Sequence, residues 1–277
     1  MAIKVEALYR MDWTFEDVKA SEGIHGLHTY PAMMAPPIAH HLIRLLSEPG
    51  DLVLDPFCGS GTVTTEAAIL GRPSIGFDIN PLALLIAEVK ATPISPDLLR
   101  EAHAEIVNSF RALQDVEPPK FKNIDYWFKP EVQRQLARLK RAIEAVGDEA
   151  VRKFFWVVFS RVVRETSNTR GSEFKLFRLP PKKLAAHSPD VFESFERHSG
   201  EAIRIMEEFW RQTGGSVVRP RLELRDTRQP LPVEPNSVQL VLTSPPYGDS
   251  RTTVAYGQFS RLSLQWLGLW DSDLDKL

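Results

Sequence analysis

The chain has 277 residues, 43% of them hydrophobic and 25% charged, which fits one large globular domain or one domain with a sizeable insertion. A formal net charge of −2 excludes a polycation, so a nucleic-acid surface would have to be a local basic patch. The single cysteine, Cys58, excludes an internal disulfide framework, and the chain shows neither a signal peptide nor a long apolar run. We therefore expect a cytoplasmic protein without a membrane span.

The first third of the chain predicts alternating strands and helices. Turn residues at Glu48–Gly50 and a glycine-rich corner after Asp55 separate the periodic segments. The expected elements are helix 38–46, strand 51–55, helix 62–70, strand 73–78 and helix 82–89. This β-α-β-α order is typical of the start of a doubly wound parallel sheet.

The pattern then changes to a long helical stretch without a strong strand, which predicts an inserted subdomain over residues 96–215. The expected helices are 97–113, 130–146, 149–163 and 191–213. The sheet resumes with a strand over 221–224 and a buried strand over 237–243, and helix 259–267 follows. The sequence thus divides into segments 20–95, 96–215 and 216–277.

The corner after the first strand reads Asp55-Pro-Phe-Cys-Gly-Ser-Gly-Thr62. Its glycines let the backbone pass close to a ligand, and the following helix offers free N–H groups. Such a corner can hold the methionine end of S-adenosylmethionine, whereas a tight turn alone is the alternative. Asp78 ends the next strand, where an acid can accept hydrogen bonds from both ribose hydroxyls. Because Pro81 follows, Asp78 could instead cap a helix.

These motifs carry a family resemblance. The corner resembles the cofactor motif of DNA amino-methyltransferases and of some RNA guanine methyltransferases. The segment Leu242-Thr-Ser-Pro-Pro-Tyr247 is similar to the catalytic motif of cytosine-N(4) DNA methyltransferases, whose adenine-modifying relatives usually have Asp or Asn in place of Ser244. His28-Thr-Tyr-Pro31 is similar to the segment that lies beside the methionine moiety. The resemblance covers roughly residues 25–90 and 220–268.

The resemblance implies an S-adenosylmethionine-dependent enzyme with a Rossmann-like α/β sheet, acting on double-stranded DNA in a prokaryotic restriction–modification system. The residues expected to bind the cofactor are Tyr30, Asp55, Pro56, Phe57, Gly59, Gly61, Thr62, Asp78 and Asp226. For Asp226, which follows the third strand, an exposed turn is the alternative to a position near the cofactor adenine. For Phe57, the alternative is the core.

The chemistry of Ser244, Pro245, Pro246 and Tyr247 can be argued from the residues themselves. An exocyclic amino nitrogen is a poor nucleophile, because its lone pair is delocalised into the ring. It needs acceptors for its two protons, which the Ser244 hydroxyl and the Pro245 carbonyl can supply, and Tyr247 can stack on a base swung out of the duplex. The alternative is a structural Pro-Pro turn. Carbon-5 methylation is disfavoured, because the only cysteine lies in the cofactor corner.

Basic and aromatic residues are densest between positions 161 and 183. Arg164, Arg170, Lys175 and Arg178 are the candidates for DNA phosphate contact, and a solvated surface is the equal alternative. The histidines show no metal-ligand spacing, so no metal is expected.

Only four strands can be counted, whereas the family sheet usually has seven. The last strand would then be an exposed, apolar edge. A second polypeptide that supplies further strands, a truncation and a homodimer are three competing explanations. An adenine-N(6) enzyme, an RNA guanine methyltransferase and a silent half-enzyme are the alternatives in function.

Overall fold

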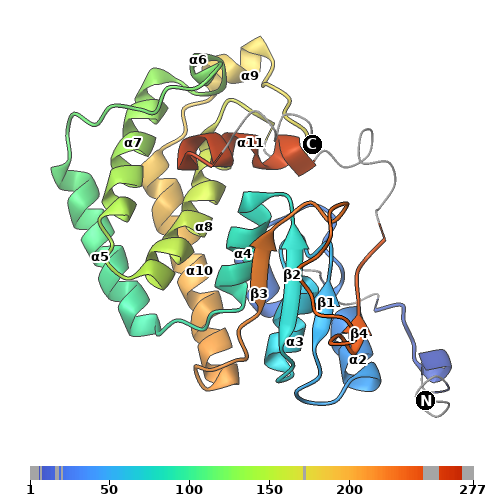
Figure 1. Cartoon of the computed structure of the whole chain (residues 1–277). Coiled ribbons are helices and arrows are strands. Elements are labelled where there is room, and N and C mark those ends of the chain that lie inside the picture. Colours follow the sequence, from blue (N-terminus) through green and yellow to red (C-terminus); the bar gives the residue numbers. More distant parts are fainter. Residues whose placement is uncertain are drawn as a thin grey trace. The chain divides into compact units, whose positions relative to one another are not determined.

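The computed structural model describes residues 6, 8–15, 19, 21–170, 173–245 and 256–269 (Figure 1). They form two compact units. The sheet unit contains the described residues up to Pro93 and those from Glu208 to Pro245, and the helical unit contains those from Ile94 to Glu207 and from 256 to 269. No helix in these described ranges is long and apolar enough to cross a membrane.

The sheet has four parallel strands in the order β3-β2-β1-β4. They are β1 Val53–Asp55, β2 Ser74–Asp78, β3 Arg221–Leu224 and β4 Leu240–Val241. Leu54 pairs with Ile75 of β2 and with Val241 of β4, so β1 lies between the strand that follows it and the last strand. This arrangement confirms the predicted α/β class with a four-stranded, Rossmann-like sheet.

The last strand corrects one prediction. We expected a buried strand over 237–243, but β4 has two residues, and Val241 is 59% exposed. The reason is its place at the sheet edge, where β1 is its only partner among the described strands. Backbone bonds to Leu52 and Leu54 extend the contact with β1 from Gln239 to Leu242. The predicted exposed edge is therefore present, although the strand that forms it is short.

Helices cover one face of this sheet, with α3 (Thr62–Ile69) central, α2 (Pro36–Leu46) on one side and α4 (Pro81–Lys90) on the other (Figure 1). Val53 belongs to the core between the sheet, α2 and α3. On the opposite face, Leu54, Ile75 and Phe77 pack against apolar side chains of the 231–238 loop. An extended loop therefore packs on this face, where doubly wound folds usually have a layer of helices.

The helical unit is built around α8 (Glu149–Thr166), which packs against α5 (Pro96–Ala112), α7 (Pro130–Glu144) and α11 (Tyr256–Leu267). Its core is aromatic: the fully buried ring of Trp266 makes edge contacts with Phe128 and Phe159. The expected long helices are present, but the sequence did not reveal the short α6 (Ile124–Trp127) and α9 (Pro181–Ala186). The sequence predicts helix 259–267 in the segment that carries the catalytic motif, whereas α11 packs on α8 in the helical unit.

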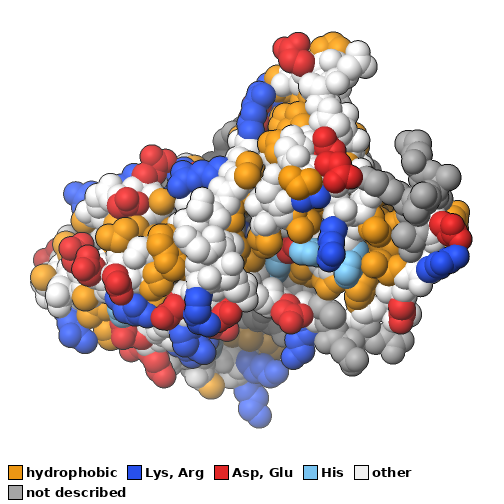
Figure 2. Space-filling view, turned by 90° about the horizontal axis from the view of Figure 1, so that it is seen from below, with side chains coloured by type: hydrophobic (Ala, Val, Ile, Leu, Met, Phe, Trp, Pro, Cys, Tyr) orange, Lys and Arg blue, Asp and Glu red, His pale blue; other side chains and the backbone are white. Residues whose placement is uncertain are grey.

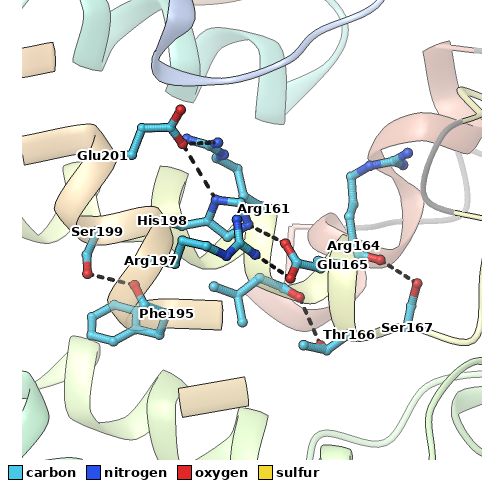
Figure 3. A network of polar contacts seen from close by, with 11 residues as sticks. Arg161, Arg164, Glu165, Thr166, Ser167, Phe195, Arg197, His198, Ser199 and Glu201 are labelled. Carbon is cyan, nitrogen blue, oxygen red and sulfur yellow. Dashed lines mark hydrogen bonds and ion pairs between the residues drawn. The ribbon is translucent and has the colours of Figure 1, made fainter. Parts of the chain in front are cut away.

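An ionic network joins α8 to α10 (Val191–Thr213), as Figure 3 shows. Glu165 accepts from Arg197 and, at 2.6 Å, from Nε2 of His198. Arg161 pairs at 2.6 Å with Glu201, which lies one helical turn after His198 on α10. Part of the basic stretch seen in the sequence is thus neutralised inside the unit, and Arg161 serves helix packing.

Candidate functional site

All four strands are parallel, so their carboxyl ends meet at one edge of the sheet. Asp55 and Asp78 are the last residues of β1 and β2, Asp226 follows β3 by two residues, and Ser244 follows β4 by three. The chain direction across the sheet reverses between β1 and β4, and such switch points are where open α/β sheets bind ligands. The sequence-predicted residues therefore converge on one edge, with Asp55 and the Thr243–Ser244 segment at the switch point.

The two glycines of the corner serve different purposes. Gly59 has φ +50°, and the nearest atom to an added Cβ would be the Tyr30 ring at 3.8 Å, so this stretch of backbone is open to a ligand. Gly61 has φ +78°, and a Cβ there would lie 2.5 Å from the Cβ of Ala87. Gly61 therefore allows α3 and α4 to approach closely, while Gly59 leaves space beside the corner.

Asp55 is almost completely buried, and its carboxylate accepts a 3.1 Å hydrogen bond from the Phe57 N–H. Burial raises its pKa to about 6, with the Asp78 carboxylate adding to the shift and the Phe57 N–H opposing it. The Leu242 N–H donates to the Leu54 carbonyl at 3.0 Å, which links the end of β1 to the segment that carries Ser244. An ionised Asp55 would gain from a cationic ligand group at this edge.

Asp78 and Asn80 organise the neighbouring loop. Asp78 accepts from the Gly59 N–H at 2.9 Å and from the Asn80 N–H at 2.8 Å, and burial raises its pKa against these bonds. Asn80, and not Asp78, caps α4, because its side chain accepts from the Leu82 N–H. The helix-cap alternative for Asp78 is therefore excluded. Asn80 also donates to the Tyr30 hydroxyl at 3.0 Å, which places the predicted Tyr30 beside the corner.

Three further predicted residues differ in setting. Phe57 is 62% exposed, so the core alternative is excluded and its ring is available at the corner. Thr62 is buried at the first turn of α3, and Pro56 connects Asp55 to Phe57. Asp226 forms a local turn in which the Arg228 guanidinium and N–H bind its carboxylate. Those bonds hold the pKa of Asp226 down at about 2 and match the turn alternative.

Ser244 is half-buried and Pro245 is exposed, directly after Thr243 at the sheet edge. Pro246 and Tyr247, the other predicted catalytic residues, lie outside the described residues. Their placement against a base therefore stays a prediction.

Sequence reasoning missed a buried polar layer beneath the corner. Lys90, at the end of α4, is fully buried and donates to the Ser60 carbonyl at 2.8 Å. Glu66 of α3 accepts from His25 and His40, each at 2.8 Å. Burial alone would raise the pKa of Glu66, but the two histidine bonds lower it to about 2. A charged residue next to apolar ones, as at Glu66 before Ala67–Ala68 and at Lys90 after Val89, is the signal that could have revealed this layer.

The candidate DNA-contacting residues lie in the helical unit, and the guanidinium groups of two of them lie against aromatic rings. The Arg164 guanidinium lies 3.9 Å from the centre of the Phe259 ring and donates to the Phe259 carbonyl, and burial lowers its pKa to about 10. Arg178 lies 4.1 Å from the centre of the Tyr126 ring. These contacts favour a structural role for Arg164.

Arg170 is exposed and pairs with Glu173 at 3.3 Å, and Lys175 is half-buried nearby. The backbone of Arg170 bonds that of Phe177 next to the Thr169–Arg178 bridge, so a short ribbon presents both arginines. On the face in Figure 2, acidic and basic side chains are interspersed.

Comparison with known proteins shows similarity to DNA methyltransferases. Residues 4–89 match the family described as DNA methylase. The Type II methyltransferase M.MvaI of Kocuria varians is 38% identical over 95% of this chain and 62% of its own length. M.MjaII of Methanocaldococcus jannaschii is 23% identical over 66% of this chain and 37% of its length, and M.BsoBI of Geobacillus stearothermophilus is 29% identical over 37% and 19%.

The chain thus spans less than two thirds of the length of these curated relatives. The match to the family includes the corner and Asp78, and the similarity to M.MvaI extends over nearly the whole chain, the helical unit included. The chain therefore resembles known DNA methyltransferases in its sheet unit and in its helical unit alike.

Proposed function

We propose that this chain carries the cofactor-binding and methyl-transfer parts of a Type II DNA methyltransferase that modifies the exocyclic amino group of cytosine. The observation that carries the proposal is the pairing of β1 with β4, which places the Asp55 corner and the Ser244–Pro245 segment at one switch point. A methyl donor and a methyl acceptor must meet within bonding distance, and adjacent strand ends meet that requirement.

S-adenosylmethionine would lie along the carboxyl edge. Its amino-acid end fits the corner, where N–H groups at the start of α3 face its carboxylate and Asp55 supplies a negative charge for its ammonium. The Asp78 carboxylate, held by two backbone N–H groups, would accept the ribose hydroxyls with its remaining lone pairs. The exposed ring of Phe57 and the buried ring of Tyr30 would flank the cofactor.

The transfer itself needs positioning of the amino nitrogen in line with the methyl group. As that nitrogen becomes tetrahedral its protons become more acidic, and acceptors at Ser244 and at the Pro245 carbonyl would stabilise the developing positive charge. Tyr247 would stack on the base outside the duplex. Cytosine is proposed over adenine because serine stands at position 244.

The helical unit would supply part of the contact with DNA. The exposed Arg170 and its neighbours Lys175 and Arg178 are the phosphate contacts that we propose, on the ribbon next to exposed Phe177. Arg164 would contribute by fixing Phe259 of α11.

The test is incubation of the chain with DNA and methyl-labelled S-adenosylmethionine, followed by mass analysis of the nucleosides. We expect N(4)-methylcytosine, a loss of about a hundredfold in rate for Ser244→Ala, and little change for the control Ser237→Ala, whose hydroxyl bonds the Glu234 carbonyl in a loop. Methylated adenine would overturn the choice of base. Cofactor binding without any product would identify a silent half-enzyme.

A further inference from the structure

The position of Lys90 needs an explanation. Its side chain is fully buried at the carboxyl end of α4, and a buried ammonium costs several kcal/mol unless it is paired. The hydrogen bond that the structure gives it goes to the Ser60 carbonyl, at 2.8 Å, inside the corner. An apolar side chain of similar size could replace a lysine that only stabilised the fold without loss of stability. The bond from Lys90 to the corner therefore indicates a role in the corner itself.

That bond is the first in a continuous series of hydrogen bonds from Lys90 to Asp78, here called the Lys90-to-Asp78 chain. The peptide group that contains the Ser60 carbonyl also contains the Gly61 N–H, which donates to the Cys58 carbonyl at 2.8 Å. The peptide group of the Cys58 carbonyl contains in turn the Gly59 N–H, which donates to the Asp78 carboxylate at 2.9 Å. An ammonium and a carboxylate are therefore joined through two peptide groups whose dipoles point the same way.

Such chains are cooperative, because each hydrogen bond polarises the peptide group that makes the next one. A positive charge on the donor end and a negative charge on the acceptor end strengthen every link. The chain closes the Cys58–Gly61 turn and fixes one oxygen of Asp78, and both are parts of the proposed cofactor site.

We propose that Lys90 is a positioning residue of the cofactor site, which holds the Cys58–Gly61 turn and the Asp78 carboxylate in place through two linked peptide groups. This inference rests on the proposed function. It assigns to Lys90 no contact with the cofactor.

The charged and titratable groups that face Lys90 are Glu66 from α3, His25 from η1 (Gly23–Leu27) and Cys58 from the corner. Burial lowers the pKa of Lys90 to about 7, with Glu66 opposing the shift. Burial also lowers the pKa of His25 to about 4 and raises that of Cys58, so both stay neutral near pH 7. The charge of Lys90 thus changes near neutral pH, while the charges of His25 and Cys58 do not.

The first experiment measures the chain of hydrogen bonds without any ligand. In the wild-type protein, the amide proton resonances of Gly59 and Gly61 should move upfield as the pH rises through about 7. In Lys90→Met both should be upfield already at pH 6.5 and should not titrate near pH 7. Unchanged resonances in Lys90→Met would overturn the proposal.

The second experiment is calorimetry with S-adenosylhomocysteine at a temperature at which all variants are folded. We expect Lys90→Met to bind about tenfold more weakly, as the loss of a charge-assisted bond predicts. The control is Arg72→Met, because Arg72 is also buried and donates to the carbonyls of Leu70 and Ser47 at the opposite end of α3. It should bind within twofold of the wild type.

Equal affinity of Lys90→Met and the wild type would overturn the proposal, and so would equal losses in Lys90→Met and Arg72→Met. A wild-type protein that binds no cofactor would contradict the proposed function instead. In that case the amide resonances still decide whether the Lys90-to-Asp78 chain exists.

Discussion

Replacement of Asp55 by asparagine should stabilise the unliganded protein while it removes a charge from the site. Burial raises the pKa of Asp55 from an ordinary value of 3.8 to about 6, so the folded state holds a proton that the unfolded state releases. The contribution of this proton to the free energy of unfolding is therefore fully present below about pH 4 and is lost as the pH rises through about 6. The difference corresponds to about 3 kcal/mol at pH 8, which Asp55→Asn should recover, since an amide never ionises and can still accept from the Phe57 N–H.

The assay is urea unfolding of Asp55→Asn and the wild type at pH 8 and at pH 5. The stability advantage of the variant should shrink at the lower pH. Asp226→Asn is the control, because Arg228 holds the pKa of Asp226 at about 2 and the stability that its carboxylate contributes is lost only below about pH 4. This variant should be destabilised equally at pH 8 and at pH 5. An effect of Asp55→Asn that is the same at both pH values would refute this account of the buried carboxyl.

Further outcomes follow from the same geometry. Cofactor affinity should fall as the pH drops below about 6, because Asp55 becomes neutral, and calorimetry across pH 5–8 measures this. An affinity that does not change below pH 6 would show that the Asp55 charge does not act on the ligand. Phe57→Ala should weaken cofactor binding but leave the melting temperature within about 2 °C, since the ring is 62% exposed. Gly61→Ala should cost about 2 kcal/mol or more in urea unfolding, because its Cβ would lie 2.5 Å from that of Ala87 at a positive φ; an unchanged midpoint contradicts the close packing. Arg170→Ala should reduce the salt dependence of DNA binding by about one counterion, and an unchanged slope would exclude a phosphate contact.

Local sequence patterns predicted the parts of the site that one segment specifies. The corner from Asp55 to Thr62 combines a strand end, two glycines and a helix start, and each is a short-range signal. Because parallel strands share an edge, the positions of Asp78 and Ser244 followed from the strand order alone.

The remaining features depend on partners far apart in the sequence. Lys90 bonds Ser60 thirty residues away, Glu66 bonds His25 across forty-one, and Arg164 reaches Phe259 across ninety-five. No periodicity indicates such pairs, because they arise only when helices and loops pack. The length of β4 was overestimated for a related reason: strand length depends on how far the neighbouring strand continues, and that is a property of the sheet.

The account depends most directly on the claim that the carboxyl edge of the sheet binds S-adenosylmethionine. Calorimetric titration of the chain with S-adenosylhomocysteine, for the wild type and for Asp78→Ala, tests that claim. We predict one binding site per chain in the wild type and its loss in Asp78→Ala, whose folded state is verified by circular dichroism. Binding that survives in Asp78→Ala unchanged, or a wild-type chain that binds none, would contradict it.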